Sequence, residues 1–255
     1  ATTLVPAARH ATTMFKNSTG DILFIFCGNE LSQLDGPIAV NAIPQNGSLD
    51  SDAQAYINKL FPTASAQYQT DINTAIVSLK AGNHWNSIQA WWNLATEYRW
   101  HSWIDVKRPT ATRITENNLP TFTANEGYTG GGTKFLNTNF NTSTDGGSNV
   151  LNNNLFHAVY NLTNSAGAFA DAGITNAPRD LAFLTKWGDN KCYIGTNWAG
   201  EEDFGVLTDP RGFIVAKRIT NTSTGYRNGS TIGSPTTHTP DAALPNLTDY
   251  IGGMN

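Results

Sequence analysis

The stretch from residue 212 to residue 233 constrains the fold more than any other part of the chain. It reads GFIVAKRITNTSTGYRNGSTIG, so a run of β-forming residues is followed by polar turns and a second β-rich run. Asn228-Gly229 lies between β-forming residues, and this pair predicts a tight hairpin because both central residues of a type I′ turn need positive φ. The C-terminal half is therefore expected to be antiparallel β-structure.

Alternation within this stretch predicts which side chains are buried. Phe213, Val215 and Ile219 share one face of an extended strand, and we expect that face to point toward the core. Lys217 interrupts the face, so the end of the strand near the turn is expected to lie in solvent.

Composition excludes several partners. Charged residues make up 14% of the 255 residues, against about 25% in an ordinary soluble domain. The net charge of −4 and the lack of a basic cluster argue against nucleic acid as a partner. The longest apolar run, residues 22–28, is too short to cross a membrane, so no membrane insertion is expected.

Three regions differ in pattern. Residues 1–49 form an N-terminal arm or a strand that pairs elsewhere, with a buried strand expected at 21–27 (DILFIFC). Residues 50–103 show helical periodicity, and residues 104–255 show short β-rich runs between turn-forming clusters.

The helical region predicts three short helices. The first has apolar residues at helical spacing, begins at Asp50 or Ser51 and stops at Pro62, and the second ends at Gly82. The apolar faces are, for the first helix, Ala53, Tyr56, Ile57, Leu60 and Phe61; for the second, Ile72, Ala75, Ile76 and Leu79; and for the third, Trp85, Ile88, Trp91, Trp92 and Ala95.

The third region predicts a sandwich or jelly roll, because many short strands recur at close spacing. The strands are expected at residues 134–137, 154–161, 180–186, 191–196, 212–219 and 247–252.

Several segments together resemble a group of bacteriophage virion proteins that carry a concanavalin A-like, or laminin-G-like, jelly roll preceded by a small helical segment. The resemblance covers residues 50 to 255, and its landmarks are 52–57, 71–80, 85–90, 127–141, 212–229 and 250–255. In that family further strands follow the strand that corresponds to residues 250–252. The resemblance therefore leads us to expect that a further segment, a partner chain or the N-terminal strand completes the sandwich.

The resemblance implies a non-enzymatic structural or adhesion role on the surface of a virion, as a capsid decoration, head fibre or tail fibre. The implied partners are other virion proteins, copies of the same chain in a homo-oligomer, and a glycan of the host surface. No cofactor and no metal are expected. Two alternatives stay open: a secreted lectin-type module that binds glycans with Ca²⁺, and a glycoside hydrolase of jelly-roll fold.

The residues needed for catalysis do not form a recognisable array. A retaining glycosidase needs two carboxylates about 5–5.5 Å apart, which alternating positions on a strand would supply. Glu201-Glu202-Asp203 is contiguous, so neighbours would point to opposite faces, and we interpret this segment as a solvated acidic loop with a Ca²⁺ site as the alternative. The segment 130–134 (GGGTK) lacks the order of a phosphate loop and is expected to be a turn that enters a strand.

Histidines and cysteines show no ligand spacing. His10, His84, His101, His157 and His238 are scattered, so structural or surface roles are expected rather than a zinc site. Cys27 and Cys192 are expected to be buried free thiols, although a disulfide between them is also possible.

The tryptophans supply the candidate ligand-binding residues. Trp187 and Trp198 lie beside polar turns and are predicted to be exposed in loops, where they could contact a glycan. The other five, Trp85, Trp91, Trp92, Trp100 and Trp103, are expected to pack the helices onto the sandwich, with a sugar-stacking surface as the alternative.

Overall fold

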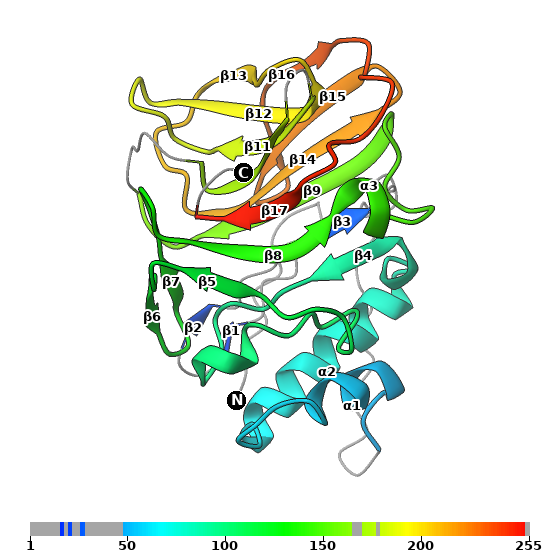
Figure 1. Ribbon diagram of the computed structural model, residues 1–255, viewed down its shortest axis with the longest axis vertical. Coiled ribbons are helices and arrows are strands. Elements are labelled where there is room, and N and C mark those ends of the chain that lie inside the picture. Colours follow the sequence, from blue (N-terminus) through cyan, green and yellow to red (C-terminus); the bar gives the residue numbers. More distant parts are fainter. Residues whose placement is uncertain are drawn as a thin grey trace.

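The computed structural model describes residues 48–164, 170–176 and 179–252, together with the backbone of three short N-terminal strands at 16–17, 20–21 and 26–28. The described chain is mainly β, as the sequence predicts, and all of its paired strands are antiparallel. Figure 1 shows the helices α1 (Ser51–Ile57) and α2 (Ala66–Ala81) at one end of the long axis and β12, β13 and β16 toward the other.

Two large sheets make up the molecule. The seven-stranded sheet has the order β13-β12-β11-β10-β17-β8-β5, and the six-stranded sheet has the order β16-β15-β14-β9-β3-β4. The strands of the first sheet are β5 (Thr115–Asn117), β8 (Phe135–Asn141), β10 (Ala172–Asn176), β11 (Arg179–Leu184), β12 (Lys191–Trp198), β13 (Glu202–Val206) and β17 (Thr248–Ile251). Those of the second are β3 (Phe26–Gly28), β4 (Ile88–Trp91), β9 (Asn154–Asn161), β14 (Gly212–Ile219), β15 (Thr222–Arg227) and β16 (Ser230–Thr237).

The remaining elements are two small sheets and three short helices. Two two-stranded sheets pair β1 (Lys16–Asn17) with β2 (Gly20–Asp21) and β6 (Thr121–Thr123) with β7 (Gly127–Thr129). The short helices are η1 (Trp85–Ser87), η2 (Arg99–His101) and α3 (Thr142–Asp145). All six strands predicted after residue 104 are present, with boundaries that differ from the prediction by a few residues at most.

The two large sheets pack face to face. One buried cluster joins Ile214 and Ala216 of the six-stranded sheet to Phe183, Ile194 and Phe204 of the seven-stranded sheet. The edge strands β13 and β16 also approach closely, since a Cβ added at Gly233 would lie 2.1 Å from the carbonyl oxygen of Phe204. The described strands therefore form an antiparallel two-sheet sandwich.

The hairpin predicted at Asn228-Gly229 is confirmed. It joins β15 to β16, and φ is 48° at Asn228 and 84° at Gly229. The expectation that one face of β14 points to the core was incomplete, because both faces are buried. Phe213 and Val215 belong to a cluster that includes α1 and α2, whereas Ile214 lies between the sheets. Ile219, expected inside, is 40% exposed.

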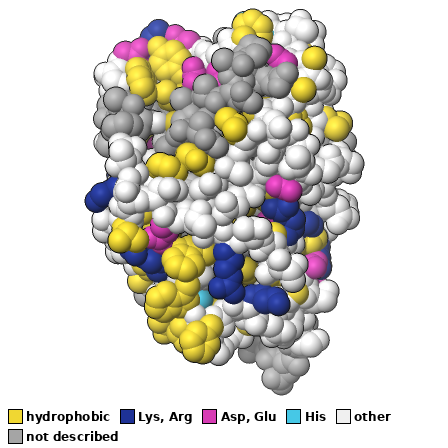
Figure 2. All heavy atoms as spheres, viewed as in Figure 1, with side chains coloured by type: hydrophobic (Ala, Val, Ile, Leu, Met, Phe, Trp, Pro, Cys, Tyr) yellow, Lys and Arg dark blue, Asp and Glu magenta, His cyan; other side chains and the backbone are white. Residues whose placement is uncertain are grey.

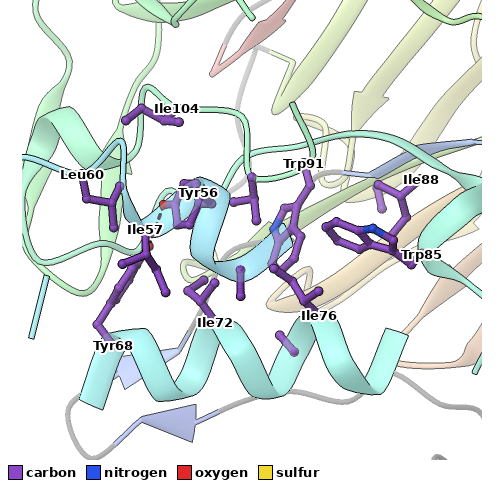
Figure 3. Close-up of a cluster of buried hydrophobic side chains, with 14 of the residues drawn as sticks. Tyr56, Ile57, Leu60, Tyr68, Ile72, Ile76, Trp85, Ile88, Trp91 and Ile104 are labelled. Carbon is purple, nitrogen blue, oxygen red and sulfur yellow. Dashed lines mark hydrogen bonds between the residues drawn. The ribbon is translucent and has the colours of Figure 1, made fainter. Parts of the chain in front are cut away.

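Helices α1 and α2 confirm the first two predicted helices. Asp50 caps α1 by accepting from the backbone N–H of Asp52, Ser65 caps α2, and Gly82 follows its last turn. Figure 3 shows the buried side chains of both helices meeting those around Trp91. Phe61 does not extend the apolar face of α1, because the helix ends at Ile57 and the Phe61 side chain is 83% exposed.

The prediction of a third helix, from Trp85 to Ala95, was wrong. Residues 85–87 form the single turn η1, and residues 88–91 form β4, which pairs with β3. The alternation is that of a strand: Ala90 and Trp92 belong to one buried cluster and Trp91 to another. Short apolar runs fit both periods, so periodicity alone did not separate helix from strand here.

The N-terminal strand pairs within the large sheet. β3 lies between β4 and β9, with Cys27 opposite Ala90 on one side and His157 on the other. The strand that carries Tyr250, β17, lies between β10 and β8 and so is internal to its sheet. Cys192 is buried and free, as expected, whereas the side chain of Cys27 and residues 22–25 of the predicted strand lie outside the described residues. Asp21, the first residue of that prediction, belongs to β2.

Candidate functional site

The two tryptophans predicted to bind a ligand lie at opposite ends of β12. Trp187 is in the turn before this strand, where its backbone N–H donates to the backbone carbonyl of Lys191. Trp198 is the last residue of the strand. Both are half-buried rather than fully exposed. Trp187 packs on the outer side of the seven-stranded sheet against Ala182 and Leu184, so the structure does not bring the two rings into one site.

Trp198 is linked to a group of buried polar residues through His238, whose Nε2 lies 3.9 Å from Oε1 of Glu202. We call Trp198, Glu202, Arg218, Ser223 and His238 the Trp198 cluster. The indole stacks on the ring of His238, with 4.3 Å between ring centroids and 22° between planes. The cluster lies at one end of the sandwich, where strands of both sheets supply its members.

Arg218 organises the interior of the Trp198 cluster. Its side chain is fully buried, and its Nε donates to the carbonyl of Thr196 at 2.5 Å. Nη1 donates to the carbonyl of His238 at 2.8 Å, and Nη2 lies 3.5 Å from Oε1 of Glu202. Burial lowers the pKa of Arg218 and Glu202 opposes this change. The arginine remains a cation that is neutralised by a buried carboxylate.

Glu202 corrects the interpretation of the acidic segment as a solvated loop. It begins strand β13, its side chain is only 1% exposed, and its Oε1 accepts from Oγ of Ser223 at 3.0 Å. Asp203 points to the opposite face, as neighbours on a strand must, and pairs with Lys191 at 2.6 Å. These two carboxylates are therefore not convergent, and each has its own cation.

The described histidines occupy separate places. His84, His101 and His157 are buried, and Nε2 of His157 lies 3.1 Å from Oδ2 of Asp249, between the two sheets. His10 is outside the described residues. Within the described ranges, no group of three or more histidine, cysteine, aspartate or glutamate side chains is placed to hold a metal ion. No helix there is long and apolar enough to span a membrane.

The tryptophans of the helical region divide into two kinds. Trp85, Trp91 and Trp92 are buried, and Trp103 is half-buried, as the packing interpretation predicts. Trp100 is different, because it is 44% exposed and stacks on Tyr98 with 6.0 Å between ring centroids.

Trp100 belongs to an exposed group that we call the aromatic patch. Its members are Phe61, Tyr98, Trp100 and Leu119, which are exposed by 83%, 39%, 44% and 69%. Their chain neighbours are hydrogen-bonded to one another: Nε2 of His101 lies 2.7 Å from the carbonyl oxygen of Pro62, and Arg99 donates to the carbonyl of Pro120 at 3.2 Å. Figure 2 shows hydrophobic side chains gathered on the lower part of one face, with Lys and Arg side chains beside them. The exposure of Phe61 and Tyr98 was not predicted, because helical periodicity placed Phe61 in the core and no motif marked Tyr98.

A third feature is an open pocket of about 480 Å³ beside Trp85. We call it the Trp85 pocket, and it is lined by Asp52, Lys80, Asn83, Trp85, Asn86 and Lys107. The indole Nε1 donates to Oδ2 of Asp52 at 2.9 Å, which fixes the ring against the start of α1. The sequence gives no signal for this pocket, since its lining comes from three separate segments.

Comparisons with protein-family models, with curated proteins and with solved structures gave no match for this chain. The function is therefore inferred from the chemistry of these three places and from the resemblance noted in the sequence.

Proposed function

We propose that the chain is a non-enzymatic structural and adhesion component of a bacteriophage virion surface. Its sandwich would be a concanavalin A-like jelly roll that carries contact surfaces for neighbouring virion proteins, for copies of itself and for a host glycan. The resemblance of residues 50–255 to such proteins supports this proposal, as does a surface with few charged residues.

The aromatic patch is the observation that carries the proposal. Phe61, Tyr98, Trp100 and Leu119 are exposed although each would gain free energy by burial, and soluble monomers seldom present such contiguous apolar groups without a partner. Aromatic anchors of this kind are enriched where proteins make contacts. The patch therefore supports a protein that works by binding a surface.

The Trp198 cluster supports recognition rather than hydrolysis. A retaining glycosidase needs an open pair of carboxylates, whereas Glu202 is buried against Arg218 and Asp203 faces away toward Lys191. The half-buried Trp198 ring, stacked on His238, is a rigid aromatic edge at this end of the sandwich.

The location is tested by finding the chain in purified particles. Antibodies against the chain, used in immunogold electron microscopy of virions from the culture that carries the gene, should label the particle surface at repeated positions. Labelling that is confined to the soluble fraction of the lysate, with intact particles unlabelled, would refute the proposal.

The contact role is tested by Trp100→Ser combined with Phe61→Ser. We expect at least a ~10-fold loss of incorporation into particles or of adsorption of the isolated protein to host cells, because each removed anchor contributes on the order of 1 kcal/mol or more. Val206→Ser is the matched control, since Val206 is 66% exposed on the edge strand β13. Both proteins should keep the wild-type melting temperature, and equal activity of the double variant and wild type would count against the patch.

A further inference from the structure

We propose that the Trp85 pocket is a binding site for an uncharged, hydroxyl-rich ligand, of the size of one saccharide residue. This inference deepens the proposed adhesion function and rests on it. The site lies in the helical segment, away from Trp187 and Trp198, the residues predicted from the sequence.

The walls of the pocket are rigid. Asp52 lies in the first turn of α1, Lys80 in the last turn of α2, and Trp85 in η1. Lys107 reaches in from the loop after Asp105, whose Oδ1 accepts from the N–H of Lys107 at 2.9 Å. The three segments, which belong to α1, to the end of α2 with η1, and to one loop, are thus held around one space before any ligand arrives, which lowers the entropy cost of binding.

The charges of the pocket cancel one another. Nζ of Lys80 lies 2.6 Å from a carboxylate oxygen of both Asp50 and Asp52. Nζ of Lys107 donates to the carbonyl of Trp85 at 2.7 Å and lies 4.1 Å from the centroid of its ring. The two ammonium groups of the lining are thus offset by Asp52 in the lining and by Asp50, which pairs with Lys80 from outside it. The net charge of these four groups is zero, so they do not favour an anion or a cation strongly.

Donors and acceptors remain available in the pocket. The side-chain amides of Asn83 and Asn86 are exposed and make no hydrogen bond within the described part of the chain. Asp52 is 46% exposed, and the bonds to Trp85 and Lys80 use its Oδ2, which leaves Oδ1 facing solvent. Lys107 has N–H groups beyond the one that it uses. This mixture of donors and acceptors around one space matches the hydroxyl groups of a sugar, each of which both donates and accepts.

The size of the space agrees with this class of ligand. A pocket of about 480 Å³ lies in the usual range of about 300–1,000 Å³ for small-molecule sites. Trp85 is only 5% exposed, so its ring forms a wall and not a free stacking surface. Binding through hydrogen bonds alone in an open pocket should be weak, with a Kd on the order of 1 mM for one residue.

The test uses the full chain with a defined set of probes. Methyl glycosides of glucose, galactose, mannose and N-acetylglucosamine are titrated while the indole N–H signal of Trp85, assigned with Trp85→Phe, is followed by NMR. Glucuronic acid and glucose 6-phosphate serve as anionic probes. We expect at least one neutral glycoside to move the signal, with a Kd that changes less than ~2-fold between 50 and 500 mM salt, since screening acts on charged ligands.

Two variants locate the binding. Lys107→Met removes the ammonium and keeps the stem over Trp85, and Asn86→Trp fills the opening. Each should weaken binding by ~10-fold or more at an unchanged melting temperature. Lys59→Met, an exposed lysine outside the lining, should bind as the wild type does.

Three results would overturn the inference: no neutral probe moves the Trp85 signal at ~50 mM, only the anionic probes bind, or both variants bind as tightly as wild type. Immunogold labelling of particles uses no saccharide. If no saccharide binds the Trp85 pocket but the particles are labelled, the inference about the pocket is refuted and the proposed function stands. If the particles are unlabelled, the proposed function is refuted.

Discussion

At the scale of single residues, Arg218 is a fully buried charge whose hydrogen bonds are made inside the sandwich. Arg218 shares its inward face with Ile214 and Ala216, and its guanidinium is held by two carbonyl oxygens and by Glu202. A buried ion pair of this kind contributes little net stability, but loss of one partner leaves an uncompensated charge. The presence of the Arg218–Glu202 pair is therefore better explained by a role in specifying one arrangement of the core than by a gain in stability.

Asp171 predicts a dependence of stability on pH. Burial raises the pKa of this carboxyl, and the two hydrogen bonds that it accepts from Thr185 oppose the rise only in part. The folded state therefore holds the proton more tightly than the unfolded state. The stability from this group is present below the unfolded pKa of about 3.9 and is lost as pH rises through the raised folded pKa.

Asp171→Asn should remove the loss of stability that occurs as pH rises, because the amide keeps an oxygen that can accept from Thr185 and carries no charge. The free energy of unfolding in urea, relative to wild type, should increase from pH 3.5 to pH 7. Asp189→Asn is a control of opposite sign, since the Tyr193 hydroxyl lowers the pKa of the exposed Asp189 carboxyl. A difference between Asp171→Asn and wild type that is constant over this pH range would contradict the explanation.

At the scale of elements, the strands were predictable wherever turn chemistry and alternation agreed. The strand β14 was placed at residues 212–219 from its β-forming residues, and Asn228-Gly229 placed the hairpin turn, whereas the bounds of β15 and β16 were not predicted. The segment 85–95 had no such punctuation, and its tryptophans fitted both a helix and a strand. The burial of both faces of β14 depends on segments far away in the sequence, which local patterns do not report.

The close approach of β13 and β16 gives the clearest prediction for an element. Gly233 has φ of 58°, and an added Cβ would lie 2.1 Å from the carbonyl oxygen of Phe204. Gly233→Ala should therefore lower the free energy of unfolding by about 2–4 kcal/mol, from backbone strain and overpacking together. Gly188→Ala, which meets open space, should change it by less than about 0.5 kcal/mol in the same urea titration. Equal values for the two variants would show that the edges are not in contact.

At the scale of the whole molecule, the helices and the sandwich share one core. Ile76 of α2 lies in the same buried cluster as Trp91 of β4, Phe156 of β9 and Val215 of β14. The regions 50–103 and 104–255, which differ in sequence pattern, are therefore joined by packing, and β3 of the region 1–49 joins them through its pairing with β4 and β9.

Ile76→Ala should accordingly destabilise the helices and the sheets together. The fully buried side chain would leave a cavity that costs about 2–4 kcal/mol, and the far-UV and near-UV circular dichroism should still melt in one shared transition at a lower temperature. Loss of the helical signal well before the near-UV signal would show that the helical segment unfolds by itself.

The candidate sites were less predictable than the fold. Trp198 was singled out because its place beside a polar turn predicted exposure in a loop, but its stacking partner His238 comes from a distant segment, just after β16. The aromatic patch depends on where α1 ends, and the Trp85 pocket depends on how η1 meets α1 and α2. Each site is defined by packing between segments, and a pattern within one segment carries no information on that.

Because β14 is buried on both faces, the outward side of the six-stranded sheet differs from that of the seven-stranded sheet. The six-stranded sheet has its outward side built into the cluster with α1 and α2, whereas the seven-stranded sheet carries half-buried Trp187 and Tyr193 on its outward side. The two broad sides are therefore chemically unlike, and a lateral contact made by one side cannot be reproduced by the other. If one broad side of each copy contacts the other broad side of the next copy by translation alone, all copies point the same way, and a layer of them shows the aromatic patch of every copy on a single side.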